Sequence, residues 1–305
     1  MQTRTKHPKL KSATVDKLFF GTLLLPTMLI VVVFILVPVI DSVYQSFLSY
    51  RTRNIITGTP GSWNDFGNYT RLFAQGRLWP ATGRTLSFVA GVVLAQFVLG
   101  LTLAVILNRE FKGSRLIRSV MMTPWVVPTI VSALIWMWLY QPQYGLIKYF
   151  VSILGGPTDF AMLNNPGTAL MGVGVTALWK QIPLMALLLL AGLQNVPGDI
   201  LEAATIDGAG AVKRFRYVTI PYLMPVIKVS VSMSIIENFK QFPLFWTMTG
   251  GGPNNATQTL AVLSYREAFV SGNYGSGAAV TTIWMLMMIL VTLLYNLAFR
   301  AQDMD

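Results

Sequence analysis

The sequence predicts an all-α integral membrane protein with six transmembrane helices. The chain has 305 residues, of which 53% are hydrophobic and only 11% are charged. Soluble domains carry about 25% charged residues, so this composition excludes an ordinary soluble surface. A helix needs about 20 mostly apolar residues to cross the hydrocarbon core of a bilayer. Apolar runs of this length lie at residues 18–40, 85–107, 119–140, 168–193, 222–249 and 277–299.

The length of these runs favours helices over barrel strands. Only helices and closed barrels satisfy the backbone polar groups in lipid, and a barrel strand has about 9–11 residues. The first run also exceeds the apolar region of a signal peptide, about 7–15 residues, and no A-x-A cleavage site follows it. We therefore expect it to remain as the first transmembrane helix, within residues 18–46.

Basic residues predict which loops face the cytoplasm. Short cytoplasmic loops attract Lys and Arg, whereas long translocated loops tolerate them. One side of the six-helix arrangement carries Arg4, Lys6, Lys9, Lys11, Lys17, Arg109, Lys112, Arg115, Arg118, Lys213, Arg214, Arg216 and Arg300. We predict that this side is cytoplasmic and includes both tails, residues 1–17 and 301–305. The net charge of +11 then follows from topology, and no nucleic-acid partner is expected.

The first external loop, residues 47–84, is long, polar and rich in Gly, Asn and Arg. It contains the sequence WNDFGNY at residues 63–69. We expect a partly ordered external cap here; a disordered loop is the alternative.

The fourth loop, residues 195–221, predicts a short helix, a turn and a second, basic helix. Asn195 suits the N-cap and Pro197 the first turn. Asp199 and Glu202 fall near the positive end of the helix dipole. Gly208 can end the helix in a left-handed conformation. A helix lying on anionic lipid is the alternative, and it fits the basic second part better than the acidic first part.

Two motifs resemble those of a known family. Residues 202–208 read EAATIDG, and Val218, Ile220 and Pro221 follow at the spacing of the EAA loop of binding-protein-dependent ABC importer permeases. Residues 249–253 read TGGGP and, with the prolines and tryptophans of the third span, resemble carbohydrate-importer permeases of the maltose and glycerol-phosphate type. The resemblance implies ATPase-coupling roles for Glu202, Ala203, Ala204, Asp207 and Gly208.

The resemblance also implies a fold, partners and a location. The fold would be that of a type I ABC importer permease, with a core at residues 85–300 that holds five transmembrane helices and the coupling loop. The partners would be a second homologous permease, two cytoplasmic ATPases and an external solute-binding protein, in a bacterial inner membrane. The chain has no G-x4-G-K-[ST] phosphate loop, so ATP and Mg²⁺ are expected on the ATPase subunits and no enzyme activity on this chain.

Polar groups in the middle of the membrane indicate the substrate route, because charges there are costly. Glu237 and Lys240 share a helix face, and Lys180 lies midway along the fourth span. Carboxamides and aromatic rings beside them suit sugar hydroxyls and C–H surfaces. The predicted pathway residues are Trp179, Lys180, Gln181, Glu237, Asn238, Lys240, Gln241, Phe242 and Trp246. The alternative is an ion pair of Glu237 with Lys240 or Lys180 that only joins helices.

Other functions are less well supported. One His, no Cys and scattered carboxylates give no catalytic triad and no metal cluster. A secondary transporter or channel would need ion-coupling carboxylates in several spans, and Glu237 is the one acid well inside the predicted spans. A membrane scaffold would not need lysines in mid-membrane. The resemblance favours a neutral mono- or oligosaccharide, but a carbohydrate with an anionic group remains open.

Overall fold

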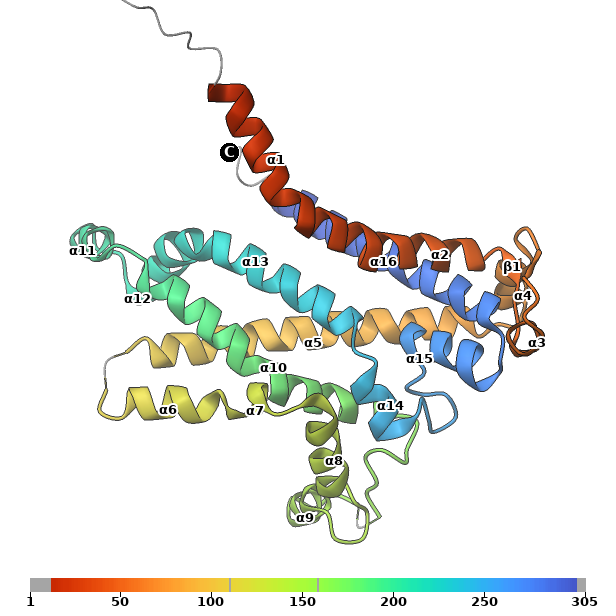
Figure 1. Cartoon of the computed structure of the whole chain (residues 1–305). Coiled ribbons are helices and arrows are strands. Elements are labelled where there is room, and N and C mark those ends of the chain that lie inside the picture. Colours follow the sequence, from red (N-terminus) through yellow and green to blue (C-terminus); the bar gives the residue numbers. More distant parts are fainter. Residues whose placement is uncertain (1–11, 110, 158, 301–305) are drawn as a thin grey trace, which may run out of the picture.

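Long helices that run side by side form the body of the molecule (Figure 1). The computed structural model describes residues 12–109, 111–157 and 159–300. Most of the first predicted tail and all of the second, at residues 1–11 and 301–305, lie outside the described residues. Within these ranges five helices are long and apolar enough to span a membrane, and a sixth span results if one bent pair is counted as one.

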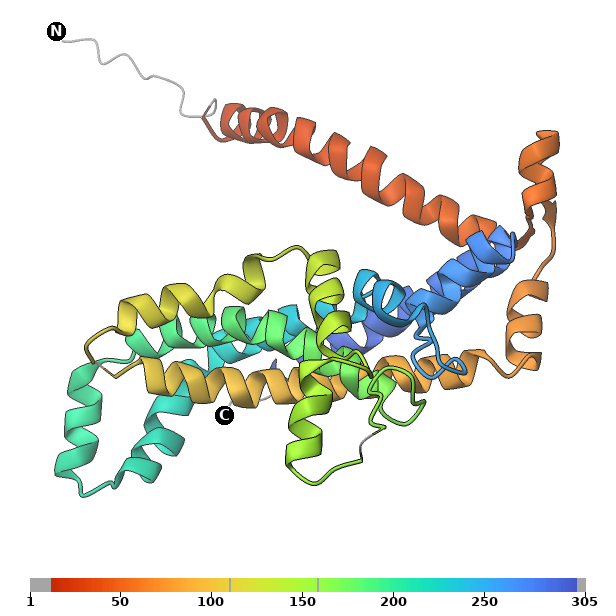
Figure 2. The same cartoon turned by 90° about the horizontal axis from the view of Figure 1, so that it is seen from below.

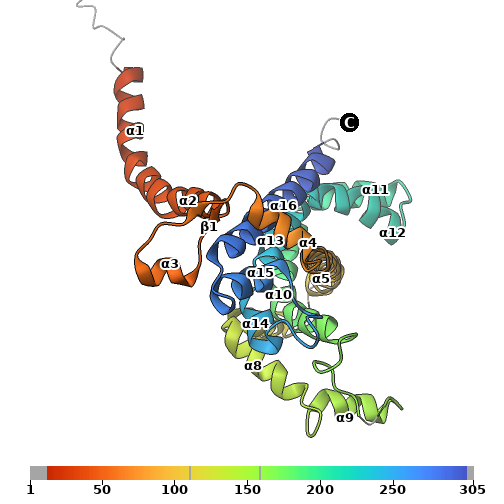
Figure 3. The same ribbon diagram turned by 90° about the vertical axis from the view of Figure 1, so that its right-hand side faces the viewer.

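The first of these helices leaves the bundle. It consists of α1 (Ser12–Val31), a π-helical turn η1 (Val32–Leu36) and α2 (Val37–Gln45). The most apolar stretch of this span has none of its residues buried. The helix extends away from the others in two perpendicular views (Figures 2 and 3), while α2 contacts the last helix, α16 (Tyr274–Arg300).

The bundle core is built on α5 (Leu78–Leu107) and α10 (Ala169–Gln194), which pack together over the most extensive contact in the structure. The span that starts at Ala211 packs on both. It joins α12 (Ala211–Arg214), the π-helical turn η2 (Phe215–Thr219) and α13 (Ile220–Phe239). A Cβ atom on Gly192 would lie 2.5 Å from Leu223 Cδ1 and 3.0 Å from Val226 Cγ2, so any side chain here would force these residues of α13 to shift.

The prediction of a third span at residues 119–140 as one helix is wrong. The chain forms α6 (Ser114–Met121), α7 (Thr123–Val126) and α8 (Thr129–Leu139), and its direction changes by 95° between α7 and α8. Val127 is extended, with φ −61° and ψ 131°. The cause is Pro128, because a proline pushes the preceding residue out of the helical region and lacks the N–H that would continue the helix.

The prediction of a fifth span at residues 222–249 is also wrong at both ends. The helix begins earlier, at Ala211, and continues through the π-helical turn η2 into α13, so Pro221 lies within the span, directly after η2. It ends at Phe239, and a separate helix α14 (Pro243–Thr249) follows. The polar residues Lys240 and Gln241 lie in this interruption.

The connections at one end of the bundle form a small ordered unit. A short antiparallel hairpin, β1 (Leu48–Ser49) with β2 (Ser62–Trp63), encloses α3 (Thr52–Thr57) and leads to α4 (Gly67–Ala74). Buried Asn68 donates to the carbonyl oxygens of Ser46 and Leu48, both at 2.8 Å. The same end carries α15 (Leu260–Tyr265) and the π-helical turn η3 (Arg266–Val270), whereas α9 (Leu146–Ile153) lies beyond α8, away from the hairpin (Figure 1).

The opposite end carries α11 (Gly198–Ile206), α12 and the loop between α5 and α6 (Figure 1). The α5–α6 loop and the α11–α12 segment are two of the basic segments predicted to face the cytoplasm. The geometry therefore groups these predicted cytoplasmic loops at one end, and the predicted external loop 47–84 folds at the other.

Candidate substrate cavity and coupling helix

A cavity of about 350 Å³ opens beside the break between α7 and α8. Small-molecule sites in proteins have volumes of about 300–1,000 Å³. The wall combines residues of α5, α7, α8, α10 and α13. It is lined by Gln96, Trp125, Thr129, Lys180, Gln181, Leu184, Met185, Leu188, Ser230, Met233, Ser234, Glu237 and Gln241.

The described part of the structure contains two larger hollows, and neither is lined by a predicted pathway residue. One of about 470 Å³ between α5, α13 and α16 is lined almost wholly by hydrocarbon side chains such as Val231 and Ile235. Another, of about 420 Å³, lies around Gln141 and Pro253 at the end of α8 that carries α9. The cavity beside the break is the one that gathers predicted pathway residues, and so it is the candidate substrate cavity.

Lys180 projects from the middle of α10 toward the broken helix. Its ammonium group donates to the backbone oxygens of Trp125, at 3.2 Å, and of Val127. These carbonyls lie at the end of α7, where the break removes the N–H groups that would have bonded them in a continuous helix. A cation at this position also opposes the negative end of the helix dipole. Lys180 therefore stabilises the break while it lines the cavity.

Two carboxamides bridge α10 and α13 across the cavity wall. Asn238 donates to Gln181 Oε1 at 2.9 Å, and Gln181 donates back to Asn238 Oδ1 at 3.3 Å. Sequence reasoning did not select Gln96, which completes this layer: its Oε1 accepts from Ser234 Oγ at 2.6 Å, and the residue is buried. A single glutamine within the apolar run of the second predicted span is the signal that could have identified it.

Glu237 also lines the cavity and forms an ion pair with Lys240, with the carboxylate oxygen 2.8 Å from Nζ. Both side chains are more than half exposed in the single chain. Of the two pairs considered from sequence, Glu237–Lys180 and Glu237–Lys240, the structure forms the second. Gln241 follows directly and lies in the same wall.

The structure does not bring the predicted aromatic residues into the cavity wall. Trp179 packs edge-to-face on Trp136 with ring centroids 5.9 Å apart. Phe242 and Trp246 stack on each other with the same separation, and Tyr265 lies 4.5 Å from the ring of Trp246. These rings join α14 to α15 and pack on the hydrophobic core.

The predicted coupling helix is α11. Its N-cap is Pro197 and carries no side-chain capping bond, so the prediction of Asn195 as N-cap is wrong, because the helix begins two residues later than expected. Gly208 ends it with a φ of +78°, as predicted. The side chain of Arg214 donates to the hydroxyl of Thr205 and ties α12 back to α11.

The surface of this helix–turn–helix is open in the single chain. Glu202, Ala203, Asp207 and Gly208 are exposed, and Ala204 is half-buried. Apolar Ile206, 86% exposed, and Val212, 80% exposed, also lie on it, although sequence reasoning had not selected them. This surface therefore presents both apolar and acidic side chains.

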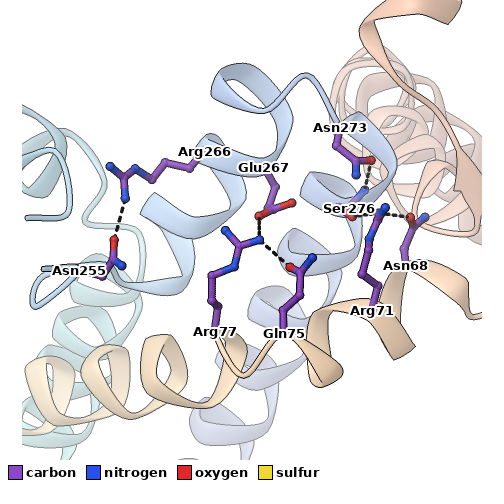
Figure 4. A network of polar contacts seen from close by, with 9 residues as sticks. All are labelled: Asn68, Arg71, Gln75, Arg77, Asn255, Arg266, Glu267, Asn273 and Ser276. Atoms are coloured by element: carbon purple, nitrogen blue, oxygen red, sulfur yellow. Dashed lines mark hydrogen bonds and ion pairs between the residues drawn. The ribbon is translucent and has the colours of Figure 1, made fainter.

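At the opposite end, arginines of the predicted external loop have structural partners (Figure 4). Arg77 pairs with buried Glu267 at 2.9 Å, and this contact joins the start of α5 to η3. Arg71 donates to Asn68 Oδ1 at 3.0 Å and to the hydroxyl of Ser276. These charges therefore hold the external unit against α16 rather than forming a free basic patch.

Comparisons with known proteins agree with this arrangement. Residues 96–303 match the family model described as the inner membrane component of binding-protein-dependent transport systems. The trehalose/maltose transport system permease MalF of Thermococcus litoralis is 36% identical over 274 residues, 90% of each chain. The sulfoquinovosyl glycerol permease SmoG of Agrobacterium fabrum is 32% identical, over 94% of this chain and 92% of its own.

Solved structures share the fold. A chain of a bacterial ABC transporter involved in the import of the acidic polysaccharide alginate superimposes with a TM-score of 0.78 at 19% identity, over 95% of this chain and 98% of its own. A chain of the MetNI methionine ABC transporter gives a TM-score of 0.55 at 17% identity, over 75% of this chain and 97% of its own.

Proposed function

The chain belongs to the inner membrane components of binding-protein-dependent transport systems, and we propose that it is one of two permease subunits of an importer for a carbohydrate. As a member of this family it is an ABC importer permease, the subunit through which the substrate crosses the membrane. Membership of this family excludes the alternative of a secondary transporter or channel. The proposal adds the substrate class, the partners and the orientation.

The candidate substrate cavity is the observation that carries the carbohydrate proposal. Its wall presents the carboxamides of Gln96, Gln181 and Gln241, which both donate and accept hydrogen bonds, as sugar hydroxyls do. The relatives MalF and SmoG are named for the transport of trehalose/maltose and of sulfoquinovosyl glycerol. A cavity of this polarity inside a permease fold supports a substrate of the same chemical class.

Energy would come from two partner ATPases, which would bind ATP and Mg²⁺. The exposed surface of α11 is the proposed docking site, with Glu202 facing basic residues of an ATPase and Ile206 entering an apolar part of its groove. Closure of the two ATPases on ATP would draw this loop and its counterpart on the second permease together. The helices that continue from the loop would transmit this movement to the cavity.

The orientation follows from the two ends of the bundle. The end with α11 and the basic α5–α6 loop would face the cytoplasm, as would both chain termini. The hairpin end would face outward and receive a loaded solute-binding protein. A solved alginate transporter has been captured with its substrate-bound periplasmic protein, which supports such a partner for this chain. The location would be the cytoplasmic membrane of a bacterial cell.

A reconstitution experiment tests the proposal. The tagged chain is expressed with the permease, ATPase and solute-binding proteins encoded beside it, and the purified complex is placed in liposomes. We expect co-purification of an ATPase and a carbohydrate that stimulates ATP hydrolysis only with its binding protein present. A complex lacking this chain is the control. Assembly without any response to a carbohydrate panel would refute the substrate class, and failure of an ATPase to co-purify would refute the partnership.

A further inference from the structure

We infer that the candidate substrate cavity takes an uncharged polyhydroxyl group, that is, a neutral sugar, and that Lys180 is a positioning residue for the broken helix rather than a ligand for an anion. This inference rests on the proposed carbohydrate function. It decides whether the carbohydrate is neutral or anionic, which the sequence leaves open. The relatives do not decide it, because SmoG and the permease UgpA of Yersinia pestis are named for substrates that carry a sulfonate and a phosphate.

Two of the three N–H donors of Lys180 are already engaged. Its ammonium donates to the carbonyls of Trp125 and Val127, which the break at Pro128 leaves without helical partners. A backbone carbonyl at membrane depth is unfavourable unless a donor satisfies it. An anionic substrate that drew the ammonium away would leave these carbonyls without donors. The same ammonium faces the negative end of the α6–α7 helix, which offsets part of its charge.

The rest of the wall does not favour an anion. Glu237 lines the cavity and would repel one, while its partner Lys240 is not among the lining residues. Lys180 and Glu237 are the two charged residues of the lining, with formal charges of +1 and −1, and Lys240 offsets part of the negative charge through its ion pair with Glu237. The lining residues all lie in the described part of the chain and include no arginine, the side chain that binds carboxylate, phosphate or sulfonate oxygens with two parallel hydrogen bonds.

The N-terminus of α8 is a feature of the wall that would favour an anion. The first turn of α8 begins at Thr129 in the cavity wall, and no side chain caps it. A helix N-terminus carries about half a positive charge and favours anions. The end of α7 has the opposite sign and lies across the same break, and the carboxylate of Glu237, which pairs with Lys240, lies in the same wall. These contributions oppose one another, so the wall has no concentrated positive site for an anion.

The carboxamides beside the cavity suit hydroxyl groups better than anionic oxygens. Gln181 and Asn238 satisfy each other with two reciprocal hydrogen bonds. A hydroxyl group donates and accepts at once, so it can take over one bond of each kind. An anionic oxygen only accepts, so it could bond the amide N–H of Gln181 but not its amide oxygen. The recognition chemistry of the wall is therefore that of neutral hydroxyl groups.

Matched substrate pairs test the ligand class. The complete importer in liposomes is assayed with maltose against maltobionic acid and with trehalose against trehalose 6-phosphate, and glycerol 3-phosphate is assayed alone. We expect uptake of a neutral member and at least tenfold lower uptake of its charged partner. Uptake of a charged compound equal to or above that of its neutral partner, or uptake of glycerol 3-phosphate alone, would overturn the inference but leave the carbohydrate function. An assembled complex that transports none of these compounds or other sugars would overturn both.

Lys180 variants test the positioning role. In K180M we expect a lower thermal midpoint of the complex and a lower maximal rate, with the KM for the transported sugar within twofold of the original value. K180R should recover both, because a guanidinium also donates to carbonyls. K148M, which makes the same change in α9, is the control. A KM raised more than tenfold in K180M at an unchanged thermal midpoint would show that Lys180 binds the substrate instead.

Discussion

The end of the coupling helix offers the sharpest test of the link between structure and transport. Gly208 has a φ of +78°, a conformation that side chains rarely adopt. Its N–H donates to the carbonyl oxygen of Thr205 and the N–H of Ala209 to that of Ala204, both at 3.0 Å. These bonds end α11 and direct the chain into α12. We predict that Gly208→Val prevents this turn and so uncouples the predicted ATPase contact from the membrane helices.

The structure separates backbone strain from crowding at this position. A Cβ atom at Gly208 would meet nothing within 4 Å, so the cost of a side chain is conformational. The left-handed conformation costs an ordinary residue about 1–2 kcal/mol, and a β-branched residue is a true outlier there. A cost of 1–2 kcal/mol changes the ratio of formed to unformed turn by about 5–30-fold.

The chain offers a matched control two residues away. Gly210 also has nothing within 4 Å, but its backbone is extended, with φ −65° and ψ 165°, a conformation that valine accepts. Uptake and the ATP hydrolysed per sugar are measured in liposomes for Gly208→Val, Gly208→Asn and Gly210→Val. We expect uptake to fall by about 5–30-fold in the first, and to stay near normal in the others, because asparagine tolerates positive φ. Equal loss in Gly208→Val and Gly210→Val, or normal uptake in Gly208→Val, would refute the reasoning.

Three further predictions use the same complex. Glu202→Lys should abolish uptake or uncouple ATP hydrolysis while the protein still reaches the membrane; normal coupled transport would remove Glu202 as the anchor. Single cysteines are informative because the chain has none: one at Gly251 should react only from outside and one at Arg214 only from inside, and the reverse result would invert the topology. Gln96→Leu removes the acceptor of Ser234, and intramembrane hydrogen bonds contribute about 0.6 kcal/mol on average and up to about 1.7. The thermal midpoint of the complex should fall by a few degrees, and the KM for the sugar should rise. If neither value changes, Gln96 does not contribute to the candidate substrate cavity.

The parts of the fold that depend on local sequence were predicted well. The fourth span is within one residue of its predicted range, and Gly208 ends the coupling helix as expected. Both features depend on neighbouring residues alone: an apolar run sets the span, and a glycine permits the turn. The start of α11 was misplaced by two residues because Asn195 and Pro197 both suit a helix start, and only the packed structure selects one of them.

The broken spans were not predictable from apolar runs, because hydropathy measures composition and not direction. The run at residues 119–140 stays apolar through the 95° bend, so Pro128 leaves no trace in it apart from the proline itself. In the fifth span the polar residues within 237–241 (ENFKQ) interrupt the apolar run only briefly, although the helix ends among them. Tertiary contacts then cover the broken ends. The reciprocal bonds of Gln181 and Asn238 were not predictable for a similar reason. They join two helices, and the sequence alone does not show which residues of the two helices lie opposite each other.

The partner of Lys180, a charged residue in mid-membrane, also depends on the broken helix. From sequence, a lysine within a span needs a partner, and Glu237, an anionic substrate and backbone carbonyls were the candidates considered for Lys180. The structure forms the last of these, with the particular carbonyls that the broken helix exposes. These acceptors are invisible in the sequence because every residue has a carbonyl and only the fold decides which of them lack a donor. A lysine within a membrane span is therefore evidence for a polar cavity or a broken helix before it is evidence for a charged substrate, and this ordering favours a neutral sugar for this permease.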